Sequence, residues 1–191
     1  MRLYSYVVAH DHGFAPNPFW GHCTLATCKP KIRLRAAPGD WVIGTGSTRA
    51  VGKGRLVFAM RVKEKLPFNS YNAARRFAKK KPRHDKDIRL ICGDNIYYKV
   101  NGRWRQRASF HRHAQMAHDV RGKYVLIAKE FYYFGVRAPM IPSSFRTLVP
   151  VGRGHRCRFD ARLVARLIRW LRRKRRGIHA DPWLFKHGHA G

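Results

Sequence analysis

The scarcity of acidic residues limits how this chain can fold. Its 191 residues include 41 Lys and Arg but only 10 Asp and Glu, so the formal net charge is +31 with histidine neutral. A chain this basic repels itself in the compact state unless counterions or polyanions lie nearby. The sequence is nevertheless 45% hydrophobic and 13% aromatic, which excludes disorder over most of its length. A folded polycation is therefore predicted.

The charge is spread over the whole chain, which bears on the partner. Residues 151–191 carry a net charge of +10, and residues 1–150 carry +21. Nucleic acid and anionic membranes are the common polyanions, and we predict nucleic acid, with DNA favoured over RNA and no membrane partner.

The cysteines and the hydrophobic segments indicate a location. Four cysteines are too few for a disulfide framework at this length. The apolar N-terminal stretch is too short for a signal peptide, and no run approaches the roughly 18 apolar residues of a membrane span. A cytoplasmic protein with reduced thiols is predicted.

The hydrophobic pattern predicts an α+β fold. Strands are expected at 2–8, 41–45, 55–62, 124–128 and 131–134, with a hairpin at 96–104 around Asn101-Gly102. The strand at 55–62 alternates and is expected to be half-buried, and 69–81 is expected to be a basic helix. The predicted fold is a small curved mixed β-sheet or a partly open PUA-like barrel with flanking helices. It forms one domain at 1–182, followed by a short flexible tail at 183–191.

The segment 160–176 gives the clearest helix prediction. Asp160 can cap its N-terminus and Gly177 can end it. The apolar residues at 163, 164, 167, 168 and 171 share one face. Four basic residues on the opposite side, here called the arginine row, are Arg162, Arg166, Arg169 and Arg173. We expect the row to contact phosphates; the alternative is a solvated face that keeps the helix soluble.

Two irregular segments are predicted to contribute to binding. In the segment 10–38, Asn17 lies between two prolines and Phe19 follows the second of them. The prolines can fix the amide and the ring for contact with a splayed base. The alternative is that these residues plug the core. The glycine-rich segment 44–54 does not have P-loop spacing. We predict a turn there, from which Arg49 and Lys53 can reach phosphate.

Histidine pairs raise the question of a metal. The chain has 11 histidines, including the pairs His10/His12, His111/His113 and His187/His189, with His22, Cys23 and Cys28 as further candidate ligands. No established spacing of zinc ligands accompanies them. The sequence therefore predicts neither a metal site nor a cofactor.

The few carboxylates restrict acid–base chemistry. Asp11, Asp94 and Asp119 have no evident structural role in the sequence, and Asp11 is flanked by His10 and His12. Asp11, His10, His12 and Asp94 are the catalytic candidates. The alternative is a polar loop anchored by Asx hydrogen bonds.

A binding concavity is expected from the same residues. We predict that it is surrounded by Asp11, Asn17, Phe19, Trp41 and Asp94, and that Gly93 allows the close backbone approach of a bound base. A protein that reads a base would use Asn17 and a carboxylate on the base edge. An enzyme would need Asp11 or His10 at the reacting atom.

Long motifs connect these segments to a known family. They are Asp11-x-Gly13-Phe-Ala-Pro-Asn-Pro-Phe19, Cys23-Thr-Leu-Ala-Thr-Cys-Lys-Pro-x-Ile-Arg33, Gly39-Asp-Trp-Val-Ile-Gly-Thr-Gly-Ser47 and Gly93-Asp-Asn95. Over nearly its whole length the chain resembles the second nucleotide modification associated domain family, which implies a link to DNA base-modification systems. The segment 39–43 is also similar to a strand of PUA-like and EVE-like readers of modified or flipped bases.

Three functions follow as hypotheses. The first is binding of DNA, with reading of a modified or flipped base, in a modification or defence system. The second is an enzyme that acts on a nucleotide or base in such a system. The third is a basic RNA-associated accessory protein with no preference for DNA.

Overall fold

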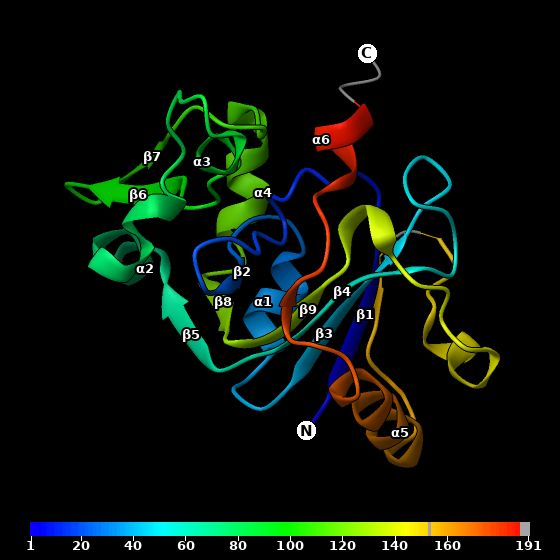
Figure 1. The fold of residues 1–191 in the computed structure, drawn as a ribbon. Coiled ribbons are helices and arrows are strands. Elements are labelled where there is room, and N and C mark those ends of the chain that lie inside the picture. The colour runs from blue at the N-terminus through cyan, green and yellow to red at the C-terminus, as the bar shows by residue number, and fades with distance from the viewer. Residues whose placement is uncertain (153, 188–191) are drawn as a thin grey trace.

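A mixed six-stranded sheet forms the centre of the molecule (Figure 1). The computed structural model describes residues 1–152 and 154–187. The strand order is β10-β1-β3-β4-β9-β11, with bounds His155–Arg156, Leu3–Val8, Trp41–Gly46, Leu56–Arg61, Glu130–Tyr133 and Gly177–Ile178. Strands β1 and β3 are parallel, as are β9 and β11, and the other neighbours are antiparallel. The sheet does not close into a barrel, because β10 and β11 lie at opposite edges.

Both faces of this sheet are covered, which corrects one prediction. Alternate residues of β1 enter different cores: Tyr4 packs with Phe58 and Met60 on one face, and Leu3 packs with Trp41 on the other. Strand β4 is consequently buried on both sides except at Arg61, and not half-buried as its alternation predicted.

A smaller layer packs beside the main sheet. Its three strands, in the order β2-β8-β5, are Cys23–Leu25, Tyr124–Ala128 and Glu64–Pro67. The hairpin of β6 (Tyr97–Val100) and β7 (Arg103–Gln106) turns at Asn101-Gly102 as predicted, and both turn residues have positive φ. Short helices complete this layer: α1 Pro30–Arg35, α2 Phe68–Ala73, α3 Ile88–Ile91 and α4 Met116–Val120. Apolar side chains of α2 and α4 contribute to a third core around Tyr71 and Phe77, whereas Ile32 of α1 packs in the core that contains Tyr4.

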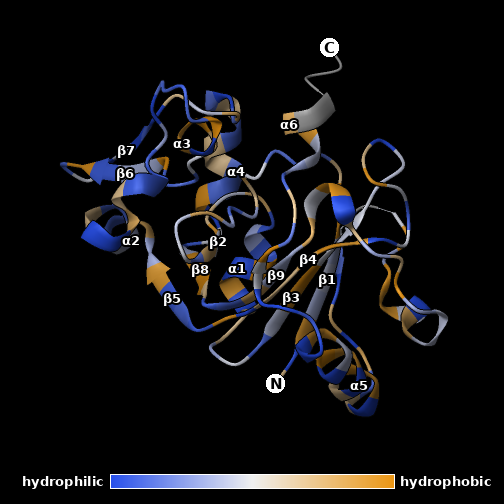
Figure 2. Cartoon of the chain, in the orientation of Figure 1, coloured by the Kyte–Doolittle hydropathy of each residue, from blue (hydrophilic) through white to orange (hydrophobic). Residues whose placement is uncertain are grey.

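Helix α5 (Ala161–Arg172) lies across the sheet face opposite α1. Asp160 caps it by accepting a hydrogen bond from the Leu163 N–H at 2.9 Å. Its apolar side buries Val164, Leu167, Ile168 and Leu171 against that face. The hydrophobic and hydrophilic residues therefore alternate around its turns (Figure 2). The helix ends at Arg172, four residues earlier than predicted.

Two other predicted segments are more structured or more broken than expected. The segment 10–38 contains β2 and α1 and is not irregular throughout. The predicted helix at 69–81 is interrupted at Ala74, whose ψ of 118° is extended, and continues as a 3₁₀ helix over Arg75–Lys80. The break turns Phe77 and Lys80 into the interior.

The C-terminal part of the chain returns to the first loop. After β11, the Asp181 carbonyl accepts a hydrogen bond from Val136 N–H at 2.9 Å, and Leu184 N–H donates to the Asp11 carbonyl at 3.2 Å. Trp183–His187 form helix α6, so the predicted tail begins with an ordered turn. The rest of that tail, at 188–191 and including His189, lies outside the described residues. Of the helices in the described ranges, none has the length and apolar character needed to cross a membrane.

Candidate functional site

The structure brings Asn17 and Asp94 together, but it seals them in the interior. Both are buried, as is Lys80, which contacts Asn17. Lys80 Nζ donates three hydrogen bonds, to Asn17 Oδ1 at 2.6 Å, to the Asn17 carbonyl at 3.0 Å and to the His22 carbonyl at 2.9 Å. A lysine nitrogen that donates three hydrogen bonds carries three protons, so Lys80 is in the charged ammonium form. The amide predicted to read a base is thus engaged with the protein itself.

Asp94 completes this sealed cluster. Its carboxylate accepts hydrogen bonds from the Thr24 and Tyr71 hydroxyls, both at 2.7 Å. Burial raises the pKa of Asp94, and burial lowers the pKa of Lys80 to about 8 against the pull of that carboxylate. A Cβ on Gly93 would lie 2.4 Å from the Lys80 carbonyl, so this glycine admits the protein's own backbone and not a bound base.

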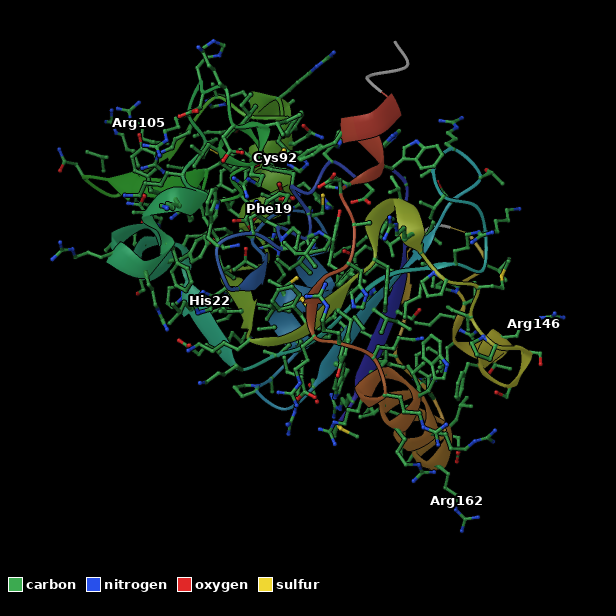
Figure 3. The ribbon with its side chains drawn as sticks, viewed as in Figure 1. Phe19, His22, Cys92, Arg105, Arg146 and Arg162 are labelled. Carbon is green, nitrogen blue, oxygen red and sulfur yellow. The ribbon has the colours of Figure 1, made fainter. Side chains whose placement is uncertain are left out.

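The predicted concavity around five residues is wrong. Trp41 belongs to the core under α5, where it stacks on Tyr132. Asp11 is buried and accepts hydrogen bonds from the Tyr133 hydroxyl and, at 3.3 Å, from Trp183 N–H. Phe19 is buried against Phe185. In Figure 3, Phe19 lies within the fold, away from the periphery. Asp11 therefore anchors a loop through internal hydrogen bonds, and the rings of Trp41 and Phe19 pack in the interior.

An open cleft of about 870 Å³ lies instead beside the end of β1. His10 and His12 line it, while Asp11 between them turns inward. A series of rings, here called the aromatic wall, forms one side and consists of His10, His12, Phe110, Phe14 and His111. Neighbouring ring centroids in the wall are 4.7–6.0 Å apart.

A Cys–His–Asp triad lies in this cleft. Cys28 Sγ is 3.4 Å from His111 Nε2, and His111 Nδ1 is 2.7 Å from an Asp119 carboxylate oxygen. All three residues line the cleft. The order of thiol, imidazole and carboxylate is that of a nucleophile, a base and the group that orients the base.

The local backbone presents Cys28 at a sharp turn. The chain leaves β2, passes through Cys28 and Lys29 with φ of 56° and 41°, and enters α1 at Pro30. Positive φ is uncommon for residues other than glycine and marks positions that the surrounding structure enforces. Proline suits the first turn of a helix because it lacks an N–H. The strand–turn–helix arrangement therefore holds the thiol at the edge of the cleft.

Arg33 fixes this turn to the segment that carries Asp119. Its buried guanidinium donates to the Cys28 carbonyl at 2.8 Å, to the Tyr124 carbonyl at 2.7 Å and to the Asp119 carbonyl. Burial lowers the pKa of Arg33 to about 10, which leaves it charged at neutral pH. Gly122 makes room for the clamp, since a Cβ there would lie 2.6 Å from the guanidinium.

Asp119 is held by three donors. Cys28 N–H donates to one carboxylate oxygen at 2.8 Å, and the Tyr97 hydroxyl donates to the other at 2.9 Å, which His111 also contacts. Burial alone would lower the pKa of His111, but its hydrogen bonds to Asp119 and Cys28 outweigh burial and raise the pKa to about 9. At neutral pH the imidazole is therefore protonated, with one N–H toward each partner.

The same three residues can be considered as metal ligands. Their ligand atoms lie within 4.8 Å of one another. However, both oxygens of Asp119 already accept hydrogen bonds, and Nδ1 of His111 is directed at one of them. Only Sγ and Nε2 remain, two ligands short of the tetrahedral set that zinc prefers. The donor set fits a triad better than a metal centre.

Sequence reasoning missed this triad, although it noted each member. The sequence pattern indicates Cys28 only as a candidate metal ligand and His111 only as half of a histidine pair. It indicates Asp119 only as a carboxylate without an evident structural role. The signal in the sequence is the motif from Cys23 to Arg33, which contains both the thiol and the guanidinium that clamps it.

The predicted phosphate-binding residues lie elsewhere on the surface. The four side chains of the arginine row are exposed, three on α5 and Arg173 at its C-cap, and Arg162 points away from the body of the protein in Figure 3. Arg49 and Lys53 are exposed on the loop between β3 and β4. The arginine row and the cleft are on opposite faces of the main sheet.

Comparison with known proteins gives one result. No characterised protein and no solved structure matches the chain. The sequence model described as nucleotide modification associated domain 2 matches residues 1–189, in agreement with the resemblance of the motifs. The chain therefore belongs to the nucleotide modification associated domain 2 family.

Proposed function

We propose that this protein is an enzyme that acts on a nucleotide or base through a covalent intermediate on Cys28. The observation that carries the proposal is the hydrogen-bonded series Cys28–His111–Asp119 in an open cleft. Family membership supports a nucleotide or base as the substrate. The aromatic wall supports it too, because planar rings stack on aromatic side chains.

The reaction step is an addition. In the ion-pair form, His111 donates Nε2–H to a Cys28 thiolate and Nδ1–H to Asp119. Sγ attacks an electrophilic carbon of the base or nucleotide, so that an S–C bond forms while a π bond at that carbon opens. His111 then gives its Nε2 proton to the atom that receives the electron pair. Asp119 keeps the imidazole oriented throughout.

Thiol alkylation tests the triad without a substrate. Iodoacetamide should modify Cys28 first, and His111→Ala should slow that modification roughly tenfold or more at pH 7, because the imidazolium no longer stabilises the attacking sulfur. Peptide mapping by mass spectrometry follows each cysteine. Burial raises the pKa of Cys23 and Cys92 to about 12, so both should stay unmodified in the folded protein.

Controls distinguish activation of Cys28 by the triad from reactivity that results only from solvent exposure of the thiol. His113→Ala is the matched control, since His113 is exposed and belongs to the same histidine pair. Cys157, which is half-buried, provides an internal reference. Equal rates of alkylation at Cys28 and Cys157 that do not change in His111→Ala would contradict the proposal. Acceleration by EDTA would favour a metal site instead. For the wild type, mass analysis after incubation with modified and unmodified oligonucleotides should reveal a Cys28 adduct or an altered base.

A second candidate function, binding of DNA, is supported by the arginine row. None of its four members forms an ion pair with a carboxylate among the described residues, whereas Arg172 and Arg176 contact Glu130. Exposed and unpaired guanidinium groups in a line suit a phosphate backbone. Because α5 and the cleft lie on opposite faces, this contact would recruit the protein to DNA independently of the chemistry at Cys28.

Neutralising the row tests this second function. Changing all four arginines to Gln should weaken duplex DNA binding and reduce the slope of log K against log salt by about one unit per lost phosphate contact. The matched control is Arg103→Gln with Arg105→Gln on the exposed hairpin. An unchanged slope in a folded variant would exclude α5 from the interface, and equal competition by duplex RNA would contradict the preference for DNA.

A further inference from the structure

A second cavity of about 650 Å³ adjoins the cleft. The two share Val7, Ala9, Lys29 and Gly154, so one substrate can extend from one into the other. The second cavity is also lined by Ser47, Thr48 and Lys53 of the loop between β3 and β4. No carboxylate lines it in the described part of the chain.

Lys29 lies where the two cavities meet, and it lacks an acidic partner. Its Nζ is 4.7 Å from the centroid of the Tyr6 ring. Within the described ranges no carboxylate forms an ion pair with it. Lys29 is half-buried, and this burial lowers the pKa of its ammonium. A half-buried ammonium without an acidic partner, at the junction of two cavities, is a position that an anion from outside would complete.

The surroundings of Lys29 are positive as well. His155, which also lines the cleft, has its pKa lowered by burial and by the charges of Arg35, Lys29 and Lys31. The only carboxylate that lines the cleft in the described residues, Asp119, is already occupied by His111. The exposed Lys53, which also lines the second cavity, supplies a further cation. An anionic group would be stabilised between the two lysines.

We infer that the substrate is phosphorylated and that its phosphate binds between Lys29 and Lys53, while its base lies in the cleft against the aromatic wall above Cys28. This inference rests on the proposed function for the nature of the substrate. Lys29 is then a specificity-determining residue, which selects a nucleotide or a nucleic-acid strand over a nucleoside. Lys29 follows Cys28 directly in the chain, so phosphate binding would fix the base relative to the sulfur.

Binding to the Cys28→Ser protein tests the phosphate site without turnover. The probes are the four deoxynucleosides, their 5′-monophosphates and a mixed-sequence single-stranded octanucleotide, measured by calorimetry at about 0.15 M salt. At least one phosphorylated probe should bind about tenfold or more tightly than its nucleoside, and Lys29→Gln should remove that advantage. Lys63→Gln, an exposed lysine outside both cavities, is the matched control and should change affinity less than about twofold.

The outcomes separate the sources of phosphate and the two proposals. Tight binding of a monophosphate identifies a free nucleotide, and tight binding of the octanucleotide alone identifies a strand. Equal affinity for nucleosides and their phosphates, equal effects of Lys29→Gln and Lys63→Gln, or no binding of any probe would overturn the inference. Thermal unfolding of both variants verifies that they fold. Since alkylation of Cys28 needs no substrate, failure here is distinguishable from failure of the triad.

Discussion

Two buried aspartates in this protein have similar partners but different surroundings. Asp94 and Asp119 each accept a hydrogen bond from a tyrosine hydroxyl, Tyr71 and Tyr97 respectively. Near Asp94, the cation is a lysine whose three protons are all used by the protein. Beside Asp119, the cation is a histidine whose second nitrogen faces a sulfur in an open cleft.

The comparison teaches that a buried carboxylate is not by itself a sign of a site. Both aspartates lie in low dielectric, and both have neighbouring cations. The difference is access. The Asp94 cluster ends inside the protein, so its hydrogen bonds contribute to stability. The hydrogen bonds of Asp119 lead to a nucleophile that a ligand can reach, so the same arrangement can perform chemistry.

The largest expected effect is the loss of Asp94. Asp94→Ala should lower the free energy of unfolding by about 3 kcal/mol or more, because it leaves Lys80 buried without that opposite charge. It also leaves the Thr24 and Tyr71 hydroxyls with only longer contacts of 3.4 Å. Cys28→Ser should change it by less than about 1 kcal/mol, since the thiol faces a cleft. Urea unfolding measures both, and a cost for Asp94→Ala no larger than for Cys28→Ser would break the comparison.

A smaller effect is expected from pH at the Asp119 cluster. The pKa of His111 is about 9 in the fold and 6.5 in an unperturbed histidine, so between these values the folded state binds more protons than the unfolded state. The stabilisation is thus complete below about pH 6.5 and is lost as the pH rises through about 9. Lys80, with its pKa lowered to about 8, contributes in the opposite direction: the fold gains stability as the pH rises from about 8 towards 10.5.

His111→Gln isolates the histidine contribution. The difference in unfolding free energy between wild type and variant should shrink by on the order of 1–3 kcal/mol from pH 6.5 to pH 9. Urea titrations at several pH values measure it, and His113→Gln should show no such trend. A constant difference over this range would mean that His111 is not protonated by its contacts with Asp119 and Cys28.

Much of the fold could be predicted from local pattern. The strands around 3–8 and 41–46, the hairpin at Asn101-Gly102 and the capped helix after Asp160 depend on neighbouring residues, and all appear in the structure. The break at Ala74 could not be predicted from neighbouring residues, because it depends on the contact of Lys80 with Asn17, 63 positions away. Single-residue burial of this kind is decided by tertiary packing.

The site was harder to predict for the same reason. Cys28 and His111 are 83 positions apart, so no spacing rule connects them. The rings and the amide of the aromatic loop at 13–21 predict a base-binding surface. The same residue types also pack well in a core, which is where the structure places most of them. The flanking histidines His10 and His12 line the cleft, and their catalytic role stays a prediction.

The hydrogen bond between Trp183 and Asp11 has a consequence for the order in which the site forms during synthesis. The residues of β1 and of the loop after it are synthesised before the rest of the described fold, but the loop that carries His10 and His12 is fastened by a segment made about 170 residues later. While the chain is still growing, the first strand can pair with β3, yet Asp11 has no backbone amide from Trp183 to bind. The aromatic wall therefore reaches its final arrangement only after translation has passed Trp183, so that a nascent chain carries the thiol of Cys28 without a completed cleft around it.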